Sequence, residues 1–290
     1  MPSPNIPRQL SALWLGFVAY KSGFLHRNTI DKDYGRKTKI INAIPIYCAT
    51  AKDVVDWIES RYATETCRRL IERFIDCYNW AIRTDRATTN PFIRYQKHFP
   101  KRSNDQRHAF TSTERDTILE AFRLRSPHFY PFIAFCFRTG CRHEEARGLE
   151  WNGIKTNHIH FYQAIATGTT TPAPLKTNDT RNFPITPKIR ALLDTQRGLS
   201  SRWVFPSLDG ATMDSQNFNN RHWKPIVDGL FKRGSIDQYL PPKHTRHTFI
   251  TIALREGMDV VDVAAVSGNS STTIWKHYAA SAREIVINDF

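Results

Sequence analysis

The sequence predicts a mainly α protein with a small antiparallel sheet, in which an all-α helical bundle precedes an α+β domain. Three observations predict this class. Over most of the first 95 residues, apolar side chains recur at the three- and four-residue steps of helices with one wet face. Strand chemistry occurs only around residues 159–186, and helical spacing returns after it. The length of 290 residues is enough for two domains, each with a sizeable core.

The first domain, residues 1–95, is predicted to be a bundle of about four helices. They cover residues 8–23, 30–43, 51–59 and 64–80. The last of them is the clearest, because its apolar residues form one stripe: Cys67, Leu70, Ile71, Phe74, Ile75 and Tyr78. In the second helix we expect the basic residues to face outward, namely Lys32, Arg36, Lys37 and Lys39.

A basic and poorly periodic segment, residues 96–107, separates the two domains. Asn90 and Pro91 end the bundle before it, because the residue that precedes a proline resists the helical conformation. Such a linker is either a solvated loop or a strap that lies across phosphates. In the second case, four of its residues are expected to bind DNA: Lys97, Lys101, Arg102 and Arg107.

The second domain, residues 108–290, is predicted to open with a helix over 115–124. Thr111 or Ser112 can cap this helix, and Glu114 suits the positive end of its dipole. A further helix begins at 131–137 and runs toward Arg142. After the strands, helices are expected at about 188–196, 217–231, 246–256, 259–266 and 271–278. Trp275, in the last helix, is expected to belong to the core.

The charge balance points to a polyanionic partner. The chain has 41 Lys and Arg against 27 Asp and Glu, a net charge of +14. Binding of phosphates releases counterions, which favours association with nucleic acid. The excess is densest in residues 1–107, which hold 19 basic and 10 acidic residues. The alternative is that the charge merely aids solubility.

Cysteine usage and apolar runs define the expected environment. Five cysteines are an odd number without the paired spacing of a zinc site, so Cys136 and Cys141 are expected to be free, buried thiols. No apolar run reaches the length that crosses a bilayer, and the N-terminus lacks a signal pattern. We therefore expect a cytoplasmic, DNA-associated protein with no membrane partner.

Two arginines and a tyrosine suggest the chemistry. Arg142 follows the turn at Gly140, Arg246 lies in a basic cluster, and Tyr278 follows about thirty residues later. A guanidinium offers a fork of donors that suits a phosphate, and a tyrosine hydroxyl can attack phosphorus. Together they indicate an enzyme that breaks and rejoins a nucleic-acid strand through a phosphotyrosine.

Each of these residues by itself has a structural alternative. Tyr278 could be a half-buried helix aromatic, and Arg142 could form a salt bridge with Glu144 or Glu145. His244 and His247 stand three residues apart, but no carboxylate lies near them in sequence, so no metal site is expected. Instead we expect His247 to pack beneath the arginine cluster and His244 to face solvent.

Taken together, these segments resemble the tyrosine recombinases, the phage integrase family. Residues 139–151 (TGCRHEEARGLEW) are similar to the family's first arginine box, and residues 243–249 (KHTRHTF) to its second. Residues 267–271 (SGNSS) align with the family's LGHSS, and the step from Asn269 to Tyr278 is the family spacing. The resemblance is strong over about 110–280 and looser before it, and the order of the features makes chance agreement improbable.

The resemblance implies a role for each site residue. Tyr278 attacks the scissile phosphate and becomes linked to its 3′ end, which frees a 5′ hydroxyl. Arg142 and Arg246 clamp the nonbridging oxygens, and Lys176, in a predicted hairpin, donates a proton to the leaving oxygen. Glu145 orients Arg142 or supports its helix. No metal ion or other cofactor is implied.

Two positions depart from the commonest family pattern. Lys243 stands where the second box usually has histidine, and it can still bind phosphate or relay the tyrosine proton. Asn269 replaces a histidine or tryptophan donor, so it can donate a hydrogen bond to phosphate but brings no charge.

The resemblance also implies partners. The domain at 1–95 is expected to be the helical core DNA-binding (SAM-like) domain, and 108–290 the catalytic domain, closed around double-stranded DNA with inverted-repeat half-sites. A homo-tetramer on DNA and an accessory directionality factor are expected. The tail, residues 279–290, either docks on a neighbouring protomer or folds onto its own domain. Two alternatives remain: a type IB topoisomerase, and a non-catalytic DNA-binding protein on a recombinase scaffold.

Overall fold

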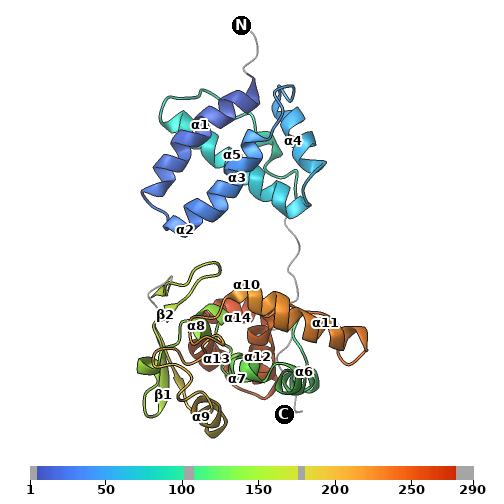
Figure 1. Cartoon of the computed structure of the whole chain (residues 1–290). Helices are drawn as coiled ribbons and strands as arrows, with labels where there is room; N and C mark the ends of the chain where they lie inside the picture. Colours follow the sequence, from blue (N-terminus) through green and yellow to red (C-terminus); the bar gives the residue numbers. More distant parts are fainter. Residues whose placement is uncertain (1–4, 101–107, 176–179, 279–290) are drawn as a thin grey trace, which may run out of the picture. The chain divides into compact units, whose positions relative to one another are not determined.

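The protein was analysed as a computed structural model, which describes residues 5–100, 108–175 and 180–278. The chain divides into two compact units, Met1–Ser103 and Asn104–Phe290 (Figure 1). The division falls inside the basic segment at 96–107. In the described ranges, no helix has both the length and the apolar character that a bilayer span requires.

The first unit is all α. Its elements are α1 (Ile6–Ser22), α2 (Arg27–Thr29), the π-helical turn η1 (Ile30–Tyr34), α3 (Gly35–Asn42), α4 (Ala51–Glu59), α5 (Thr64–Arg83) and the 3₁₀ turn η2 (Ile93–Tyr95). The helices expected at 8–23, 51–59 and 64–80 are present to within a few residues. The helix expected over 30–43 is part of a longer helical segment that begins at Arg27 and ends at Asn42, because α2, η1 and α3 follow one another without a break.

Helix α5 packs against α1 and α4. All six residues of its predicted apolar stripe are buried, and the Tyr78 hydroxyl donates a hydrogen bond to Gln9 of α1 at 3.1 Å. Lys37 was expected to face outward, which is wrong. It is buried with 7% of its surface exposed and forms an ion pair with Asp33, one turn earlier. A lysine can lay its long apolar stem along a core while its ammonium group keeps a partner.

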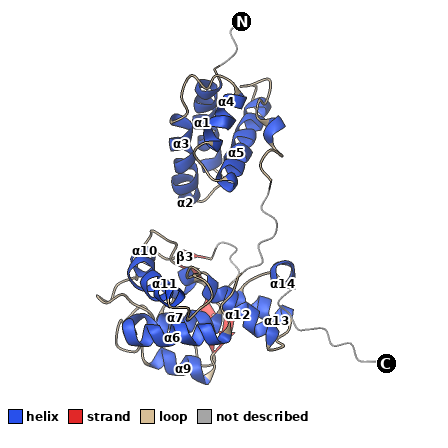
Figure 2. Ribbon diagram, turned by 90° about the vertical axis from the view of Figure 1, so that its right-hand side faces the viewer, coloured by secondary structure: helices blue, strands red, loops and turns tan. Residues whose placement is uncertain are grey.

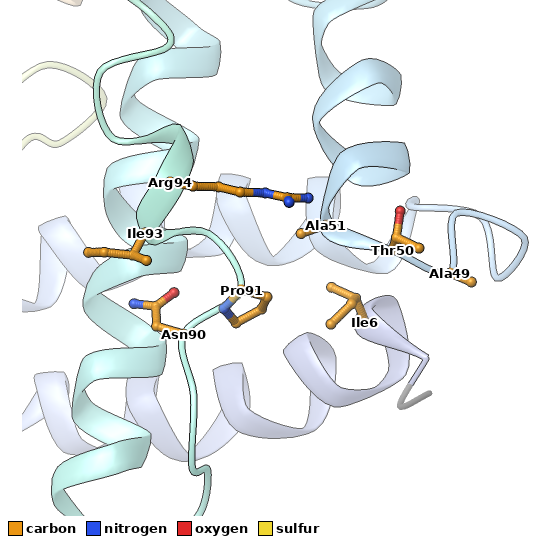
Figure 3. A pocket seen from close by; sticks show the side chains of 8 residues that line it. All are labelled: Ile6, Ala49, Thr50, Ala51, Asn90, Pro91, Ile93 and Arg94. Atoms are coloured by element: carbon orange, nitrogen blue, oxygen red, sulfur yellow. The ribbon is translucent and has the colours of Figure 1, made fainter. Parts of the chain in front are cut away.

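The start of the basic segment belongs to the first unit. Phe99 is buried, and Tyr95 packs against the same core, whereas Lys97 is exposed. A pocket in this unit is lined by residues of α1, the start of α4 and the turn that follows Asn90, and Figure 3 shows the Arg94 side chain reaching across it toward Ala51. Residues 101–107, which complete the basic segment, lie outside the described residues.

The second unit is α+β, as Figure 2 shows by the small share of strand. Its longer helices are α6 (Ser112–Arg125), α7 (Tyr130–Thr139), α9 (Pro187–Asp194), α11 (Lys224–Lys232), α12 (His244–Arg255), α13 (Val260–Ser267) and α14 (Ser271–Tyr278). Shorter helical segments are α8 (His143–Arg147), α10 (Ser215–Phe218), η3 (Pro127–Phe129), η4 (Trp151–Gly153) and η5 (Asn219–Trp223). The strands are β1 (His158–Phe161), β2 (Gln163–Ala164), β3 (Ala173–Pro174) and β4 (Arg181–Pro184).

Helix α7 forms the core of this unit. Its residues 131–137 are all buried, as expected of a helix that is apolar all round, and it packs against α6, α9 and α12. Helix α6 begins at Ser112, three residues before the predicted start, and the expected cap Thr111 forms a capping box in which Thr111 and Glu114 bond each other's backbone. Cys136 and Cys141 are buried and free, as expected.

The predicted small antiparallel sheet is confirmed as two antiparallel pairs. Strand β1 pairs with β4, with Phe161 opposite Arg181, and β2 pairs with β3. Ile159, Phe161 and Phe183 face the core, and the intervening residues are more exposed. This register places Arg181, the first residue of β4, opposite Phe161, the last residue of β1, and the guanidinium of Arg181 lies over the Phe161 ring.

Helices α12, α13 and α14 share a small apolar cluster that contains Ile274 and Tyr278 of α14. Trp275 was expected in the core, and this is wrong, because 58% of its surface is exposed. In a helix, residues four apart face the same side, so the burial of Ile274 and Tyr278 turns the neighbouring Trp275 away from the cluster.

Candidate active site

The turn after α7 depends on a glycine. Gly140 has φ +61°, and a Cβ at this position would lie 2.2 Å from Cδ1 of Phe249 in α12. Any other residue would therefore be strained and would also clash. Because α7 and α12 come this close, the Gly140 carbonyl accepts a hydrogen bond from Nη1 of Arg246 at 2.7 Å.

A second glycine carbonyl joins the two arginines. Gly268, with φ +66°, ends α13, and a Cβ there would lie 2.9 Å from Nη1 of Arg181. The Gly268 carbonyl oxygen accepts from Nη2 of Arg142 at 3.2 Å and from Nη2 of Arg246 at 3.3 Å. Two guanidinium groups from segments about a hundred residues apart are thus held at one oxygen atom.

Glu145 is the counterion of this cluster, and 1% of its side chain is exposed. Its Oε1 accepts from Nη1 of Arg142 at 2.7 Å, and its Oε2 accepts from the Arg142 backbone N–H at 2.8 Å. Nη2 of Arg181 donates to Oε2 at 2.6 Å. Burial alone would raise the pKa of Glu145, but the hydrogen bonds and charges of Arg181 and Arg142 outweigh it and hold the pKa below its ordinary value.

Arg181 is a member of the site that the sequence analysis did not single out. It begins β4, its Nε donates to the Val266 carbonyl at 2.9 Å, and its guanidinium lies 4.5 Å from the centre of the Phe161 ring. Its side chain is 8% exposed. The one available signal was its position at the end of the basic stretch that starts at Lys176.

The cluster has an excess of positive charge. Three guanidinium groups (Arg142, Arg181 and Arg246) surround one carboxylate. Burial, and then the charge of Arg142, lower the pKa of Arg246 to about 10, which leaves it protonated at neutral pH. Arg142 is half-exposed, with 49% of its side chain open to solvent. An arriving anion can therefore bind a guanidinium fork that is already held in place.

Asn269 adds an uncharged donor beside the cluster. Its backbone N–H donates to the Ala264 carbonyl at 3.1 Å, which fixes the residue after Gly268. Its side-chain Nδ2 is buried and has no hydrogen-bond partner among the described residues. A buried donor without a partner costs about 1–3 kcal/mol, so this amide is suited to a ligand oxygen.

Tyr278 ends α14 with its ring in the apolar cluster and 1% of its surface exposed. Its hydroxyl forms a hydrogen bond with Nδ1 of His247, the residue that follows Arg246 in α12. His247 was expected to pack beneath the arginines, and instead it contacts the expected nucleophile. The tyrosine hydroxyl and the basic cluster are thus connected through adjacent residues of one helix.

Lys243 and His244 lie at the beginning of α12. Lys243 is the exposed N-cap residue. His244 was expected to face solvent, which is wrong, because it is half-buried and its Nδ1 bonds the His108 carbonyl at 2.7 Å. This bond ties the first turn of α12 to the chain that leads into α6.

Some expected site residues lie outside the described residues, namely Lys176, Lys101, Arg102 and Arg107. Lys97 is described and lies in the first unit. Arg147, another buried arginine that the sequence analysis passed over, donates to the carbonyls of Met213 at 2.7 Å, Ile165 at 3.0 Å and Thr169 at 3.3 Å. It thereby holds the loop between β2 and β3.

A helical unit followed by an α+β unit, with two arginines on one carbonyl and a tyrosine hydroxyl on the histidine that follows one of them, is typical of one class of enzyme: the site-specific recombinases of the tyrosine type. A profile of the phage integrase family matches residues 95–284, more than half of the chain. The chain belongs to the phage integrase family.

Known proteins agree with this assignment. The tyrosine recombinase XerC of Oceanobacillus iheyensis is 26% identical over 249 residues, which are 79% of this chain and 76% of that protein. A Tn1549 transposon integrase in complex with circular intermediate DNA matches 93% of this chain and 94% of its own, with a TM-score of 0.77 and 18% identity. A lambda integrase dimer bound to a COC′ core site matches 96% of this chain and 98% of its own, with a TM-score of 0.69 and 15% identity. The two solved structures show the same fold.

Proposed function

We propose that this recombinase cuts and rejoins duplex DNA through a 3′-phosphotyrosine formed by Tyr278. One observation supports this above all. Arg142 and Arg246 donate to the same Gly268 carbonyl, while the Tyr278 hydroxyl contacts the residue next to Arg246. Arg246, one of the two arginines proposed to bind the phosphate, is therefore the neighbour in α12 of the residue that contacts the proposed nucleophile.

In this mechanism the described residues bind and polarise the phosphate. Arg142 and Arg246 bind the nonbridging oxygens and stabilise the negative charge of the pentacoordinate transition state. Asn269 donates its unpaired amide N–H to the same phosphate. Glu145 holds Arg142 in its orientation by accepting a hydrogen bond from its guanidinium, and Arg181 fixes Glu145 by donating to the same carboxylate.

The chemical step exchanges one phosphate ester for another. The Tyr278 hydroxyl gives up its proton to a neighbouring base as its oxygen bonds to phosphorus, the bond from phosphorus to the 5′ oxygen breaks, and Lys176 gives that oxygen a proton. The reverse step, with a 5′ hydroxyl from another strand, rejoins the DNA. The phosphotyrosine keeps the energy of the original ester, so rejoining consumes no nucleotide.

We propose double-stranded DNA with inverted-repeat half-sites as the substrate, and a homo-tetramer on that DNA as the active assembly. Support comes from structural relatives that are described as DNA complexes, among them a lambda integrase tetramer bound to a Holliday junction (TM-score 0.69, 13% identity). The first unit and Lys97, Lys101, Arg102 and Arg107 are proposed to contact the DNA. The tail at 279–290 and an accessory directionality factor are proposed to regulate assembly.

A nicked suicide substrate tests the proposal. Short duplexes are prepared from the DNA that flanks the gene, each with a nick just beyond a candidate cleavage position. After cleavage, the short fragment that carries the 5′ hydroxyl diffuses away, so the strand cannot be rejoined and the covalent adduct accumulates. We expect wild-type protein to form an adduct and Tyr278→Phe to form none while binding DNA equally well. Tight binding without an adduct in the wild type would support the non-catalytic alternative.

The topoisomerase alternative predicts a different result. An enzyme of that type relaxes any supercoiled plasmid without a partner strand or a specific site. We expect no relaxation of a plasmid that lacks the flanking DNA, and recombination between two copies of the site on one plasmid. If the plasmid without the site were relaxed rapidly, the reaction would be that of a topoisomerase and not site-specific recombination.

A further inference from the structure

We propose that His247 is the catalytic base that takes the proton from the Tyr278 hydroxyl during cleavage. The inference rests on the proposed phosphotyrosine reaction and adds a residue to it. By the family resemblance, Lys243 was expected either to bind phosphate or to relay the proton of the tyrosine. The contacts in the second unit point to a different group.

The first observation is direct contact. Nδ1 of His247 is hydrogen-bonded to the Tyr278 hydroxyl, and the two ring centres lie 5.9 Å apart. Neutral imidazole has one nitrogen with a lone pair, so in the tautomer with its hydrogen on Nε2 the hydroxyl donates to Nδ1. A base must lie within hydrogen-bond reach of the proton that it removes, and His247 does.

The second observation is that both partners are held. Tyr278 is packed into the cluster of α12, α13 and α14 with Ile274. His247 is one residue beyond Arg246, whose guanidinium is anchored on the Gly140 and Gly268 carbonyls. The base, the nucleophile and the phosphate-binding arginine therefore keep a constant arrangement, which is the condition for efficient proton transfer.

The neighbouring groups are less suited to this role. Lys243 is exposed at the N-cap of α12, and an ammonium group has no lone pair with which to accept a proton. Nδ1 of His244 is engaged with the His108 carbonyl, and its ring lies 4.9 Å from that of His247. The ionisable neighbours of His247 in sequence include Lys243, His244 and Arg246, and Tyr278 of α14 contacts its ring.

The step balances without another reactant. As the Tyr278 oxygen bonds to phosphorus, its O–H bond breaks and the proton passes to Nδ1, which gives an imidazolium. The bond from phosphorus to the 5′ oxygen breaks with its electron pair, and that oxygen takes a proton from the expected general acid, Lys176. On rejoining, the attacking 5′ hydroxyl returns its proton to Lys176, and the imidazolium returns its proton to the departing phenolate.

Single-turnover cleavage of the suicide substrate tests this with His247→Asn, which keeps a polar group near the position of Nδ1 but is not basic. General-base catalysis is worth about 10²–10⁴ in rate, so we expect a loss of about that size. His244→Ala is the matched control, a histidine one turn earlier that does not contact Tyr278, and should cleave at close to the wild-type rate. Thermal melting and DNA affinity verify that both variants fold.

A second arm separates a base from a merely positioning residue. With difluorotyrosine in place of Tyr278, the phenol is more acidic and needs less help to lose its proton. By Brønsted behaviour, the rate lost on His247→Asn should then shrink by at least about tenfold. An equal loss with both phenols would show that His247 only positions the tyrosine and would overturn the inference, as would His247→Asn with a wild-type rate. In either case adduct formation by wild-type protein, and its absence in Tyr278→Phe, would leave the proposed function intact.

Discussion

At the scale of single residues, Glu145 holds one negative charge between Arg142 and Arg181. Replacement by Gln removes that charge and leaves two guanidinium groups facing each other. Loss of one partner of a buried ion pair costs about 3–5 kcal/mol, and we expect Glu145→Gln to lower the free energy of unfolding by about that amount. Urea titration measures it.

The control for this change is Glu120→Gln in α6, which removes an exposed ion pair with Arg123. Surface pairs add little to stability, so its unfolding midpoint should stay at the wild-type value. Equal stability of Glu145→Gln and Glu120→Gln would contradict the role of the buried carboxylate as counterion.

The same carboxylate predicts a dependence on pH. The pKa of Glu145 is lower in the folded protein than in the unfolded chain, where it is about 4.3. Its contribution to stability is therefore complete above about pH 5 and is lost as the pH falls through the folded pKa. The difference in unfolding free energy between wild type and Glu145→Gln should narrow as the pH falls below about 4. A difference that stays constant from pH 6 to pH 3 would refute this.

Replacement of Asn269 is expected to change the rate of cleavage but not the stability of the fold. Its Nδ2 has no partner among the described residues, so Asn269→Ala should leave the melting temperature unchanged or slightly higher. Loss of one donor to the transition state costs about 10²–10³ in rate, and we expect suicide cleavage to slow by about that factor. If cleavage were unaffected, the amide would not contact the phosphate.

At the scale of elements, the junction of α7 and α12 depends on Gly140. Gly140→Ala combines an αL backbone with a clash against Phe249, and should destabilise the protein by about 2–5 kcal/mol. Gly198→Ala is the matched control, since Gly198 also has positive φ (+86°) but has nothing within 4 Å of its added Cβ. Gly198→Ala should lower the free energy of unfolding by only about 1–2 kcal/mol, because it adds the strain of the left-handed backbone but no clash. Equal losses in urea titrations would show that the close packing is unimportant.

Helices were the elements that local pattern predicted best. The stripe of α5 and the capping box of α6 depend on residues within a few positions of each other, so the sequence contains all the information that they need. The errors at Lys37 and Trp275 have the opposite origin. Whether a side chain at the margin of a helix is covered depends on which neighbour packs there, and this is settled by the path of the whole chain.

At the scale of the whole molecule, the net charge of +14 predicts how DNA binding responds to salt. A protein that contacts 6–10 phosphates loses about 10³–10⁵ in affinity between 50 and 200 mM salt. We expect a loss of this order in anisotropy titrations of the full chain. Replacing Lys101 and Arg102 by Gln should lower the slope of log affinity against log salt by about 2, or about 1 for each lost contact.

The control for the salt experiment is Lys52→Gln, which removes an exposed lysine that pairs with Asp56 in α4. Its slope should match the wild type. A flat salt response of the wild-type protein would contradict phosphate binding altogether, and an unchanged slope on replacing Lys101 and Arg102 would show that the basic segment does not contact the DNA.

The sequence by itself determined the fold class, the helices and the identity of the residues in the two arginine boxes, because these are set by local period and by motif. Only the tertiary structure decided how they meet. It placed Arg181 on Glu145, brought Arg142 and Arg246 to the Gly268 carbonyl, and set His247 rather than Lys243 against Tyr278. These contacts join segments up to 126 residues apart, and such contacts follow from how helices and strands pack, which no local pattern encodes.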